Sequence, residues 1–375
     1  MTSEILPPPI WVDRQASFEK MVTELSVQSR IAVDTESNSL HAYREQVCLV
    51  QFSTPKTDYI LDPFVFEDLN ALAPLFSDPK IEKIFHAAEY DLLCLKRDFG
   101  FKFAHLFDTM HAARVLGYSF VGLDNMLAEK VGIKVDKRHQ KADWGARPLS
   151  TAQIDYARFD THFLFQLRDI LEKELEEKER LELAREDFAR ACKVEQPRGK
   201  ENGASWRRFS ARKDVSTREL TILSELCIFR DQVAEQMDRP PFKVVDDDTL
   251  LTIARNLPER DVDLAGIGLS PKQIRLWGNE ILAAARRGAD APLITREQVK
   301  RPSDVMLRRL EKLKNWRKTL AKEMGVESDV VLPKVYLNPL AENPPKTLDD
   351  LKSILGNSPW RFHQYGMQIL KMLGG

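Results

Sequence analysis

The chain has 375 residues, which is longer than one hydrophobic core usually accommodates, so we expect two or three domains. Hydrophobic residues account for 43% and charged residues for 30% of the sequence, and these proportions exclude a disordered or fibrous protein. The formal net charge is −1, so the chain as a whole does not attract nucleic acid, and any basic surface must be local.

Cysteine usage and the first residues indicate the compartment. The cysteines form no Cys-x-x-Cys pair and lie in or beside apolar runs, which predicts buried free thiols in a reducing environment: Cys48, Cys94, Cys192 and Cys227. Residues 1–9 lack the basic and apolar stretches of a signal peptide. No apolar run approaches the roughly 20 residues needed to cross a bilayer. We therefore expect a cytoplasmic protein that does not associate with membranes.

The first 190 residues alternate between predicted strands and helices, a pattern typical of an α/β fold on a mixed sheet. The strands are expected at residues 31–36, 47–52, 58–62, 83–87 and 106–108. The helices are expected at residues 17–29, 69–77, 89–98, 109–116, 123–131, 150–171 and 172–190. Short spacers separate the first three strands, which predicts an antiparallel meander.

A polar loop at residues 138–148 interrupts this pattern between two helices. Its cations, Arg138, Lys141 and Arg147, either contact phosphates or tie the loop to the domain, and the sequence does not separate these two interpretations.

The composition changes again at residues 197–218, where seven basic residues stand against two acidic ones. Trp206 and Phe209 lie among the cations, which include Arg207 and Arg208. We interpret the segment as a linker that either contacts phosphates or is simply soluble.

Beyond this linker the sequence repeats itself. Phe229-Arg230 returns as Trp316-Arg317 at a separation of 87 residues, and Pro271 returns as Pro359 after a one-residue insertion. Matched positions are mostly apolar or turn-forming, which indicates two copies of one small helical domain. Neither copy holds a cluster of acids, histidines or cysteines, so we interpret both as binding or spacing modules.

The strongest chemical signal is Asp34-Thr35-Glu36 at the end of the first predicted strand. Side chains at i and i+2 leave the same face of a strand, about 6–7 Å apart at the backbone. Two carboxylates held this close repel each other unless they share a proton or a cation. Oxygen ligands favour a hard ion such as Mg²⁺ or Mn²⁺. A lone pair of this kind more often faces solvent, so further ligands must come from elsewhere in the chain.

Two later segments offer such ligands. Asp91 stands in the first turn of a helix that follows a strand, where the helix dipole would also stabilise it. Tyr156 and Asp160 share a helix face at i and i+4, a spacing that also occurs on ordinary helix surfaces. Nearby His86 is interpreted as a core histidine at a strand end. Together the chain supplies four acids and one tyrosine on separate elements of one α/β domain.

The order of these motifs resembles the DEDD superfamily of 3′→5′ exonucleases, in the subgroup whose last motif carries a tyrosine. The surrounding sequence is similar to the ribonuclease D family, and the two repeats resemble HRDC domains, so the resemblance covers nearly the whole chain. The segments that carry it are Val33-Asp34-Thr35-Glu36, Phe85-His86-Ala87, Asp91-Leu92, Phe107-Asp108-Thr109, Asp143-Trp144, Arg147-Pro148-Leu149-Ser150, Tyr156-Ala157 and Asp160.

This resemblance implies a ribonuclease H-like α/β mixed-sheet exonuclease domain followed by two small all-α HRDC domains. The expected boundaries are residues 1–195 for the exonuclease domain, 196–214 for the basic linker, and 215–292 and 300–375 for the HRDC domains.

The implied chemistry is hydrolysis with two divalent ions, Mg²⁺ or Mn²⁺, on either side of a phosphodiester. Asp34 is expected to bridge both ions, Glu36 and Asp160 to complete the site of the attacking water, and Asp91 to serve the second ion. The hydroxyl of Tyr156 is expected to orient the water, because a free tyrosine titrates near pH 10 and is a poor base.

The implied reaction releases nucleoside 5′-monophosphates from RNA 3′ ends, with tRNA precursors and other small structured RNAs as substrates. No segment indicates an obligate protein partner, and we expect a monomer. A DNA exonuclease is the alternative enzyme, because these acids do not distinguish the two sugars. A catalytically silent nucleic-acid-binding scaffold is the third hypothesis, which a missing carboxylate would favour.

Overall fold

The computed structural model describes residues 7–195, 204–296, 301–356 and 358–374. The chain divides into two compact units. Unit 1 comprises Met1–Glu36, Val47–Glu195 and Arg301–Gly375, and unit 2 comprises Ser37–Gln46 and Gln196–Lys300. Unit 1 therefore combines the α/β domain with the second helical repeat, whereas unit 2 contains the first repeat.

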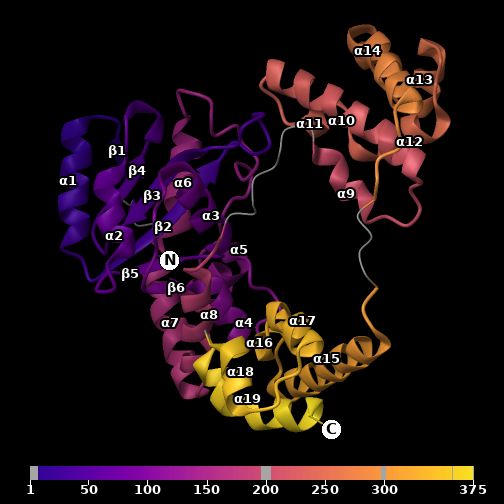
Figure 1. Ribbon diagram of the computed structural model, residues 1–375. Coiled ribbons are helices and arrows are strands. Elements are labelled where there is room, and N and C mark those ends of the chain that lie inside the picture. Colours follow the sequence, from indigo (N-terminus) through magenta and orange to yellow (C-terminus); the bar gives the residue numbers. More distant parts are fainter. Residues whose placement is uncertain (1–6, 196–203, 297–300, 357, 375) are drawn as a thin grey trace. The chain divides into compact units, whose positions relative to one another are not determined.

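Unit 1 is built on a six-stranded mixed sheet with the order β1-β4-β3-β2-β5-β6 (Figure 1). The strands are β1 (Ile10–Val12), β2 (Arg30–Ser37), β3 (Val47–Ser53), β4 (Asp58–Leu61), β5 (Glu82–Phe85) and β6 (Leu106–Asp108). β3 and β4 pair antiparallel, while β1 with β4, β2 with β5, and β5 with β6 pair parallel. The predicted mixed sheet is confirmed, but β1 was not predicted, because three residues after a proline run show no strand periodicity.

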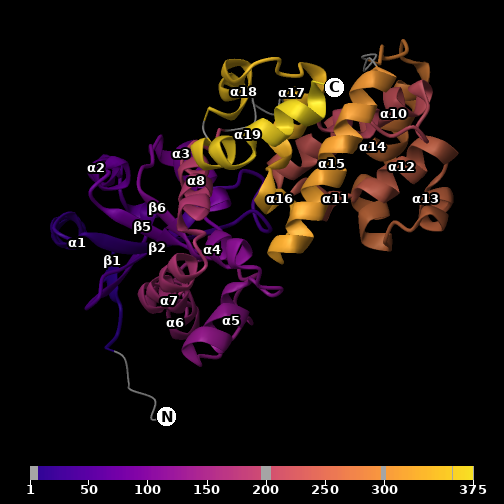
Figure 2. The same ribbon diagram turned by 90° about the horizontal axis from the view of Figure 1, so that it is seen from below.

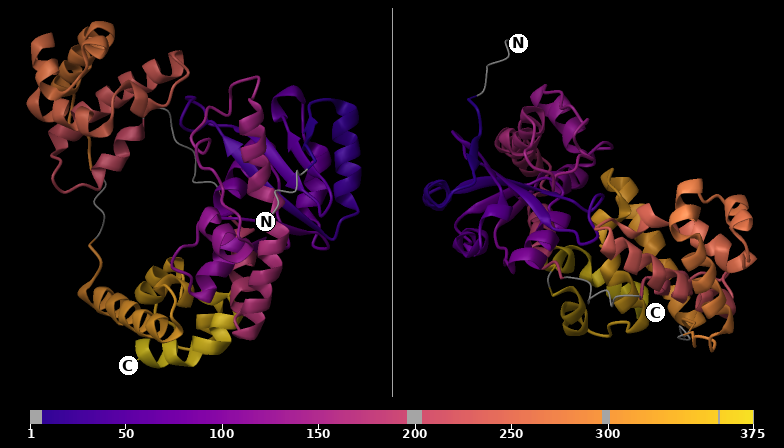
Figure 3. Two further views of the ribbon diagram at one scale, coloured as in Figure 1. Left: turned by 180° about the vertical axis from the view of Figure 1, so that it is seen from behind. Right: turned by 90° about the horizontal axis from the view of Figure 1, so that it is seen from above.

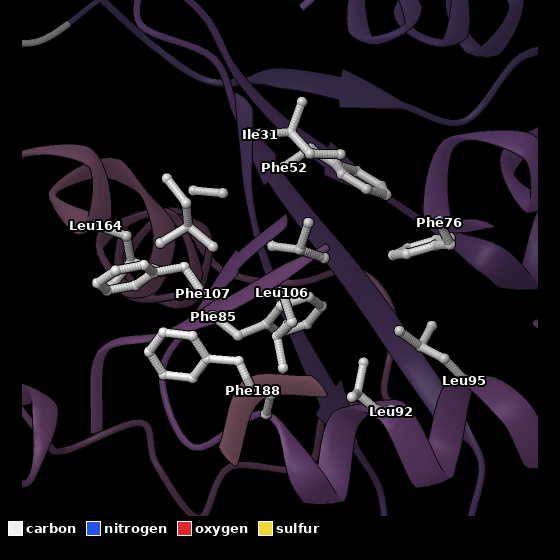
Figure 4. Close-up of a cluster of buried hydrophobic side chains, with 14 of the residues drawn as sticks. Ile31, Phe52, Phe76, Phe85, Leu92, Leu95, Leu106, Phe107, Leu164 and Phe188 are labelled. Carbon is white, nitrogen blue, oxygen red and sulfur yellow. The ribbon is translucent and has the colours of Figure 1, made fainter. Parts of the chain in front are cut away.

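Helices cover this sheet. They are α1 (Gln15–Ser26), α2 (Ala73–Ser77), α3 (Glu89–Phe99), α4 (Thr109–Leu116), α5 (Leu123–Met126), α6 (Thr151–His162), α7 (Leu164–Glu177) and α8 (Leu181–Ala191). α6 packs on β3 and β4, α7 on β5, and α8 on β6. Large apolar side chains from strands and helices fill the space between these layers, among them Phe52, Phe85, Leu95 and Phe188 (Figure 4).

Several predicted helices have different limits in the structure. The helix expected at residues 150–171 begins as predicted, with the Ser150 hydroxyl capping Gln153, but the chain turns at Phe163 and separates α6 from α7. The next predicted helix is interrupted at Glu179, which adopts a left-handed conformation with φ 56°. The helix expected at residues 123–131 begins as α5 and continues as a wider π-helical turn, Leu127–Val131. The one expected at residues 69–77 is a 3₁₀ turn followed by the short α2.

The two repeats correspond helix by helix. The first contains α10 (Thr217–Gln236), α11 (Pro241–Val244), α12 (Asp247–Asn256), α13 (Asp261–Ile267) and α14 (Pro271–Asp290). The second contains α15 (Asp304–Met324), α16 (Ser328–Val331), α17 (Lys334–Glu342), α18 (Leu348–Leu355) and α19 (Pro359–Leu373). The described helices of unit 2, drawn in coral and orange, form a bundle around one apolar core (Figure 3).

Part of the predicted linker, residues 204–210, is helical in the structure. Residues 196–203 lie outside the described residues, but residues 204–210 form a short 3₁₀ turn and α9 (Arg207–Ser210). Trp206 and Phe209 pack into the core of unit 2. Their apolar rings explain the difference, because burial of an aromatic side chain outweighs the polar character of its neighbours.

Within unit 1 the second repeat packs against the α/β domain, with α19 beside α8 (Figure 2). The buried Arg361 guanidinium contacts the carboxylates of Glu186 and Asp187 on α8, with Nη1 2.9 Å from Asp187 Oδ1. The backbone N–H of Trp360 also donates to Glu186, at 2.9 Å. Glu186 therefore caps the first turn of α19 from a different domain.

A second contact joins α4 to the first turn of α16 and the residues before it. The Arg114 guanidinium lies 2.8 Å from Glu327 and 2.6 Å from Asp329. Gly117 ends α4 with φ 92°, and a Cβ at this position would lie only 2.2 Å from the carbonyl oxygen of Gly325. No side chain fits there without displacing the second repeat.

Candidate active site

Strand topology brings the predicted acids together. β2 and β5 are parallel neighbours, so their carboxyl ends meet at one edge of the sheet. Asp34 and Glu36 lie near the carboxyl end of β2. Helix α3, which carries Asp91, begins four residues after β5. α6 packs beside this edge and adds Tyr156 and Asp160.

Three of the four acids form one group. Carboxylate oxygens of Asp34, Glu36 and Asp160 all lie within 4.8 Å of one another. Asp91 stands apart from this group, and its Oδ1 accepts a hydrogen bond of 2.5 Å from the Thr35 hydroxyl. Because Thr35 lies between the two acids of β2, its side chain leaves the opposite face of the strand. Thr35 was not predicted as a site residue, although the alternation along the strand placed its side chain opposite the two acids.

Burial and mutual repulsion raise the pKa of each of the four predicted acids. Burial, followed by the charges of the neighbouring acids, raises the pKa values of Asp34 and Glu36 well above the ordinary range. Burial raises the pKa of Asp91 to about 7, against the hydrogen bond from Thr35 that lowers it. Burial and the charge of Asp91 raise the pKa of Asp160 to about 7. The site therefore lacks positive charge.

Tyr156 stays protonated in this environment. Burial and the charges of Asp160, Glu36 and Asp34 raise the pKa of its phenol far above the ordinary value. Its ring packs 5.9 Å from Trp144 and 6.2 Å from His139, measured between ring centroids. The hydroxyl is thus available as a hydrogen-bond donor and is a poor base.

Asp108 organises the turn that leads into α3. Its fully buried carboxylate accepts hydrogen bonds from the backbone N–H groups of Ala87 and Ala88, at 3.1 and 2.8 Å. It also caps α4 and lies 2.9 Å from the His111 ring, which lowers the pKa of Asp108 to about 2 although burial opposes this. Ala87 adopts φ 62°, so the turn needs such an anchor. Asp108 belongs to a segment that carries the family resemblance, but no role was predicted for it.

His86 occupies the same turn. Its Nδ1 lies 2.9 Å from the Thr109 hydroxyl, and burial lowers its pKa. This contact agrees with the interpretation of His86 as a core histidine at a strand end.

The basic residues proposed for nucleic acid have different surroundings. Arg147 directs its guanidinium to Asp62 and to the carbonyl oxygens of Cys48, Trp144 and Ala146, so it anchors the loop. Arg138 and Arg208 are exposed and pair with neighbouring carboxylates, while Lys141 and Arg207 are also exposed. Phosphate contacts by these five residues stay a prediction.

The acid group fits a hard divalent cation. Its donors are all carboxylate oxygens, and no described Lys or Arg forms an ion pair with Asp34, Glu36 or Asp160. Burial and the mutual repulsion of the acids raise their pKa values, and no described cation offsets this repulsion. A divalent cation would supply that compensation.

Similarity to known proteins gives independent evidence for the nature of this site. Residues 9–176 match the 3'-5' exonuclease family, and residues 219–285 and 306–373 each match the HRDC domain. Ribonuclease D of Gluconacetobacter diazotrophicus is 30% identical over 98% of this chain and 94% of its own length.

Two further proteins are similar. The exosome complex exonuclease RRP6 of Saccharomyces cerevisiae is 32% identical over 69% of this chain, which spans only 37% of the yeast protein. The crystal structure of Escherichia coli RNase D, described as an exoribonuclease involved in structured RNA processing, is 23% identical. The match covers 98% of this chain and 99% of the Escherichia coli chain, with a TM-score of 0.71, which establishes the likeness of fold.

No described helix is both long and apolar enough to span a membrane.

Proposed function

The chain belongs to the ribonuclease D family, and from this premise we propose that it is a 3′→5′ exoribonuclease that releases nucleoside 5′-monophosphates. The observation that carries the proposal is the uncompensated group of Asp34, Glu36 and Asp160 beside a protonated Tyr156. An acid group of this kind, next to a hydroxyl donor, suits hydrolysis of a phosphodiester.

Each residue has a distinct task in this proposal. Asp34, Glu36 and Asp160 would hold one divalent ion, Mg²⁺ or Mn²⁺, and Asp91 would serve a second, with Asp34 shared between them. Bound there, the ions supply activation of water and stabilisation of negative charge on the leaving oxygen. Tyr156 donates its hydroxyl hydrogen bond and orients the attacking water. Thr35 and Asp108 hold Asp91 and its helix in place.

The reaction balances without any further reactant. Water forms a new bond to the phosphorus of the terminal nucleotide, and the bond from phosphorus to the 3′ oxygen of the preceding nucleotide breaks. The water proton passes to that 3′ oxygen, which leaves a shortened RNA with a 3′ hydroxyl. The released product carries its phosphate on the 5′ oxygen.

We infer that the substrates are tRNA precursors and other small structured RNAs. Support comes from the two helical repeats, which contribute no catalytic acid and are free to hold the body of a folded RNA. The Escherichia coli relative is itself described as acting in structured RNA processing.

The deciding experiment is digestion of 5′-labelled RNA and DNA of one sequence, with Mg²⁺, with Mn²⁺ and with a chelator. We expect a ladder that shortens from the 3′ end of RNA, metal dependence, and nucleoside 5′-monophosphates as product. Faster digestion of the DNA strand would favour a DNA exonuclease. Activity in the presence of chelator would contradict the proposed mechanism.

A further inference from the structure

The two helical repeats share one fold but carry opposite charge. The second repeat, residues 306–373, has twelve basic and seven acidic residues, whereas the first, residues 219–285, has seven basic and twelve acidic. Their first long helices show the same reversal. α15 has seven basic residues against three acidic ones, and the equivalent α10 has two against four. Since the whole chain is nearly neutral, the difference is a local property of each repeat.

The cations of α15 are exposed and unpaired within the described part of the chain. Five of them project from the outer side of the helix and form no ion pair or hydrogen bond with a described residue: Arg308, Lys312, Lys314, Lys318 and Lys322. The other side of α15 packs into the repeat core through Leu313 and Ala321.

In α10 both cations bind groups of the first repeat itself. Arg230 is buried and binds Asp247 at 2.7 Å and the carbonyl oxygen of Val245 at 3.1 Å. Arg218 donates to the carbonyl oxygens of Ala289 and Ala291. α10 therefore offers no free cation to an external anion.

The spacing of the α15 cations matches an extended polyanion. Lys314, Lys318 and Lys322 follow one another at i and i+4, where like charges repel. From Arg308 to Lys322 the helix rises about 20 Å, at 1.5 Å per residue. A helix face of this length can lie beside several successive phosphates of one RNA strand. Phosphates placed along the helix would relieve the repulsion.

We propose that the outer face of α15 binds the phosphate backbone of the RNA substrate, and that the first repeat does not bind RNA through α10. This inference rests on the proposed function. The second repeat suits the task because Arg361 and Arg114 fix it to the α/β domain within unit 1. A bound RNA body is thus held by the same unit that contains the acid group.

The test compares two triple variants of the full chain. One carries Lys314→Gln, Lys318→Gln and Lys322→Gln on α15. The matched control carries Lys243→Gln, Lys272→Gln and Arg275→Gln in the first repeat, which removes equal charge from exposed positions. Affinity for a labelled hairpin RNA of about 30 nucleotides is measured by fluorescence anisotropy in chelator, between about 50 and 200 mM salt.

We expect the α15 variant to bind about 10-fold more weakly or worse, and its slope of log affinity against log salt to flatten by about 2, for three lost phosphate contacts. The control should change affinity less than about twofold. Arginine at the same three α15 positions should keep affinity, because it keeps the charge. Equal losses in both glutamine variants, or no loss in either, would overturn the inference.

A separate readout keeps this result distinct from the proposed function. Hydrolysis of a labelled trinucleotide by the unaltered protein tests the active site alone, because such a substrate has no body for a second contact. If the protein does not hydrolyse the trinucleotide but its hairpin binding depends on α15, the proposed function is wrong and the binding surface stands. Normal hydrolysis with α15-independent binding would remove only the binding surface.

Discussion

Unit 1 contains two groups of acids that differ in how their charge is balanced. Glu186 and Asp187 are buried, and Arg361, itself fully buried, lies between them and adds hydrogen bonds to the carbonyl oxygens of Val330 and Val331. Asp34 and its neighbours have no such partner among the described residues, and their pKa values are raised. The comparison shows two outcomes for buried acids. Where a guanidinium balances their charge, the acids join two parts of the fold. Where no cation of the protein does so, the acids can bind a metal ion.

Removing one charge from the unbalanced group should have the largest effect. Asp34→Asn should lower kcat by at least about 10³-fold, because it removes a ligand shared by both proposed ions. Stability in metal-free buffer should be unchanged or higher, since repulsion falls. Turnover on labelled RNA and a thermal melt in chelator check the two halves of this prediction. Near-normal turnover in a folded variant would contradict the assignment of Asp34.

Breaking the balanced group should destabilise the protein. Arg361→Met leaves Glu186 buried without a cation and leaves Asp187 paired only with Arg190, which should cost about 3–5 kcal/mol of unfolding free energy. Urea unfolding of unit 1 measures this cost.

The first repeat offers a matched control. Gln273 occupies the position equivalent to Arg361. Its amide nitrogen donates to the carbonyl oxygen of Val244 at 2.8 Å, and its amide oxygen accepts from the backbone N–H and the hydroxyl of Ser270 at 2.9 and 2.7 Å. Because Gln273 is neutral, Gln273→Met should cost only about 1–2 kcal/mol. Similar costs at both positions would mean that the ion pairs with α8 add nothing to stability.

Tyr156 tests the part of the candidate site that carries no charge. Tyr156→Phe should lower kcat by about 10²-fold and leave KM unchanged, if the hydroxyl orients water. The ring contact with Trp144 would persist in phenylalanine, so packing is controlled. A rise in KM with normal kcat would instead assign Tyr156 to substrate binding.

The pH dependence of stability without metal gives a further test of the unbalanced group. Asp91 and Asp160 have folded-state pKa values of about 7, above their unfolded values near 4, so the folded state holds more protons between these limits. Stability should therefore fall by a few kcal/mol as pH rises from about 5 to 8. Saturating Mg²⁺ should remove the slope. Stability that rises with pH in chelator would show that the acids are already compensated.

Much of the geometry of the candidate site was predictable because it depends on local patterns. The alternation along β2 placed Asp34 and Glu36 on one face, and helical spacing placed Tyr156 near Asp160. The structure adds that Asp91 stands outside the closest group and is held by Thr35. That contact joins residues 56 positions apart, which no local periodicity encodes.

The fold was harder to predict wherever long-range pairing decides it. The sequence predicted successive domains, with every proposed ligand before residue 161. In the structure Arg361 pairs with acids about 175 positions earlier, which joins the second repeat to the exonuclease domain. Similarly, β1 is a strand only because it pairs with β4, and Phe209 is buried only because unit 2 has an apolar core beside it.

The pairing of Arg361 with α8 also affects folding during synthesis. A ribosome completes α8 long before it reaches α19, and at about 5–20 residues per second the interval is roughly 10 to 30 seconds. During that interval Glu186, Asp187 and the apolar surface around them have no partner from the second repeat. The nascent exonuclease domain must therefore wait, with two acids and an apolar patch exposed to solvent, until the last helix of the chain arrives to close it.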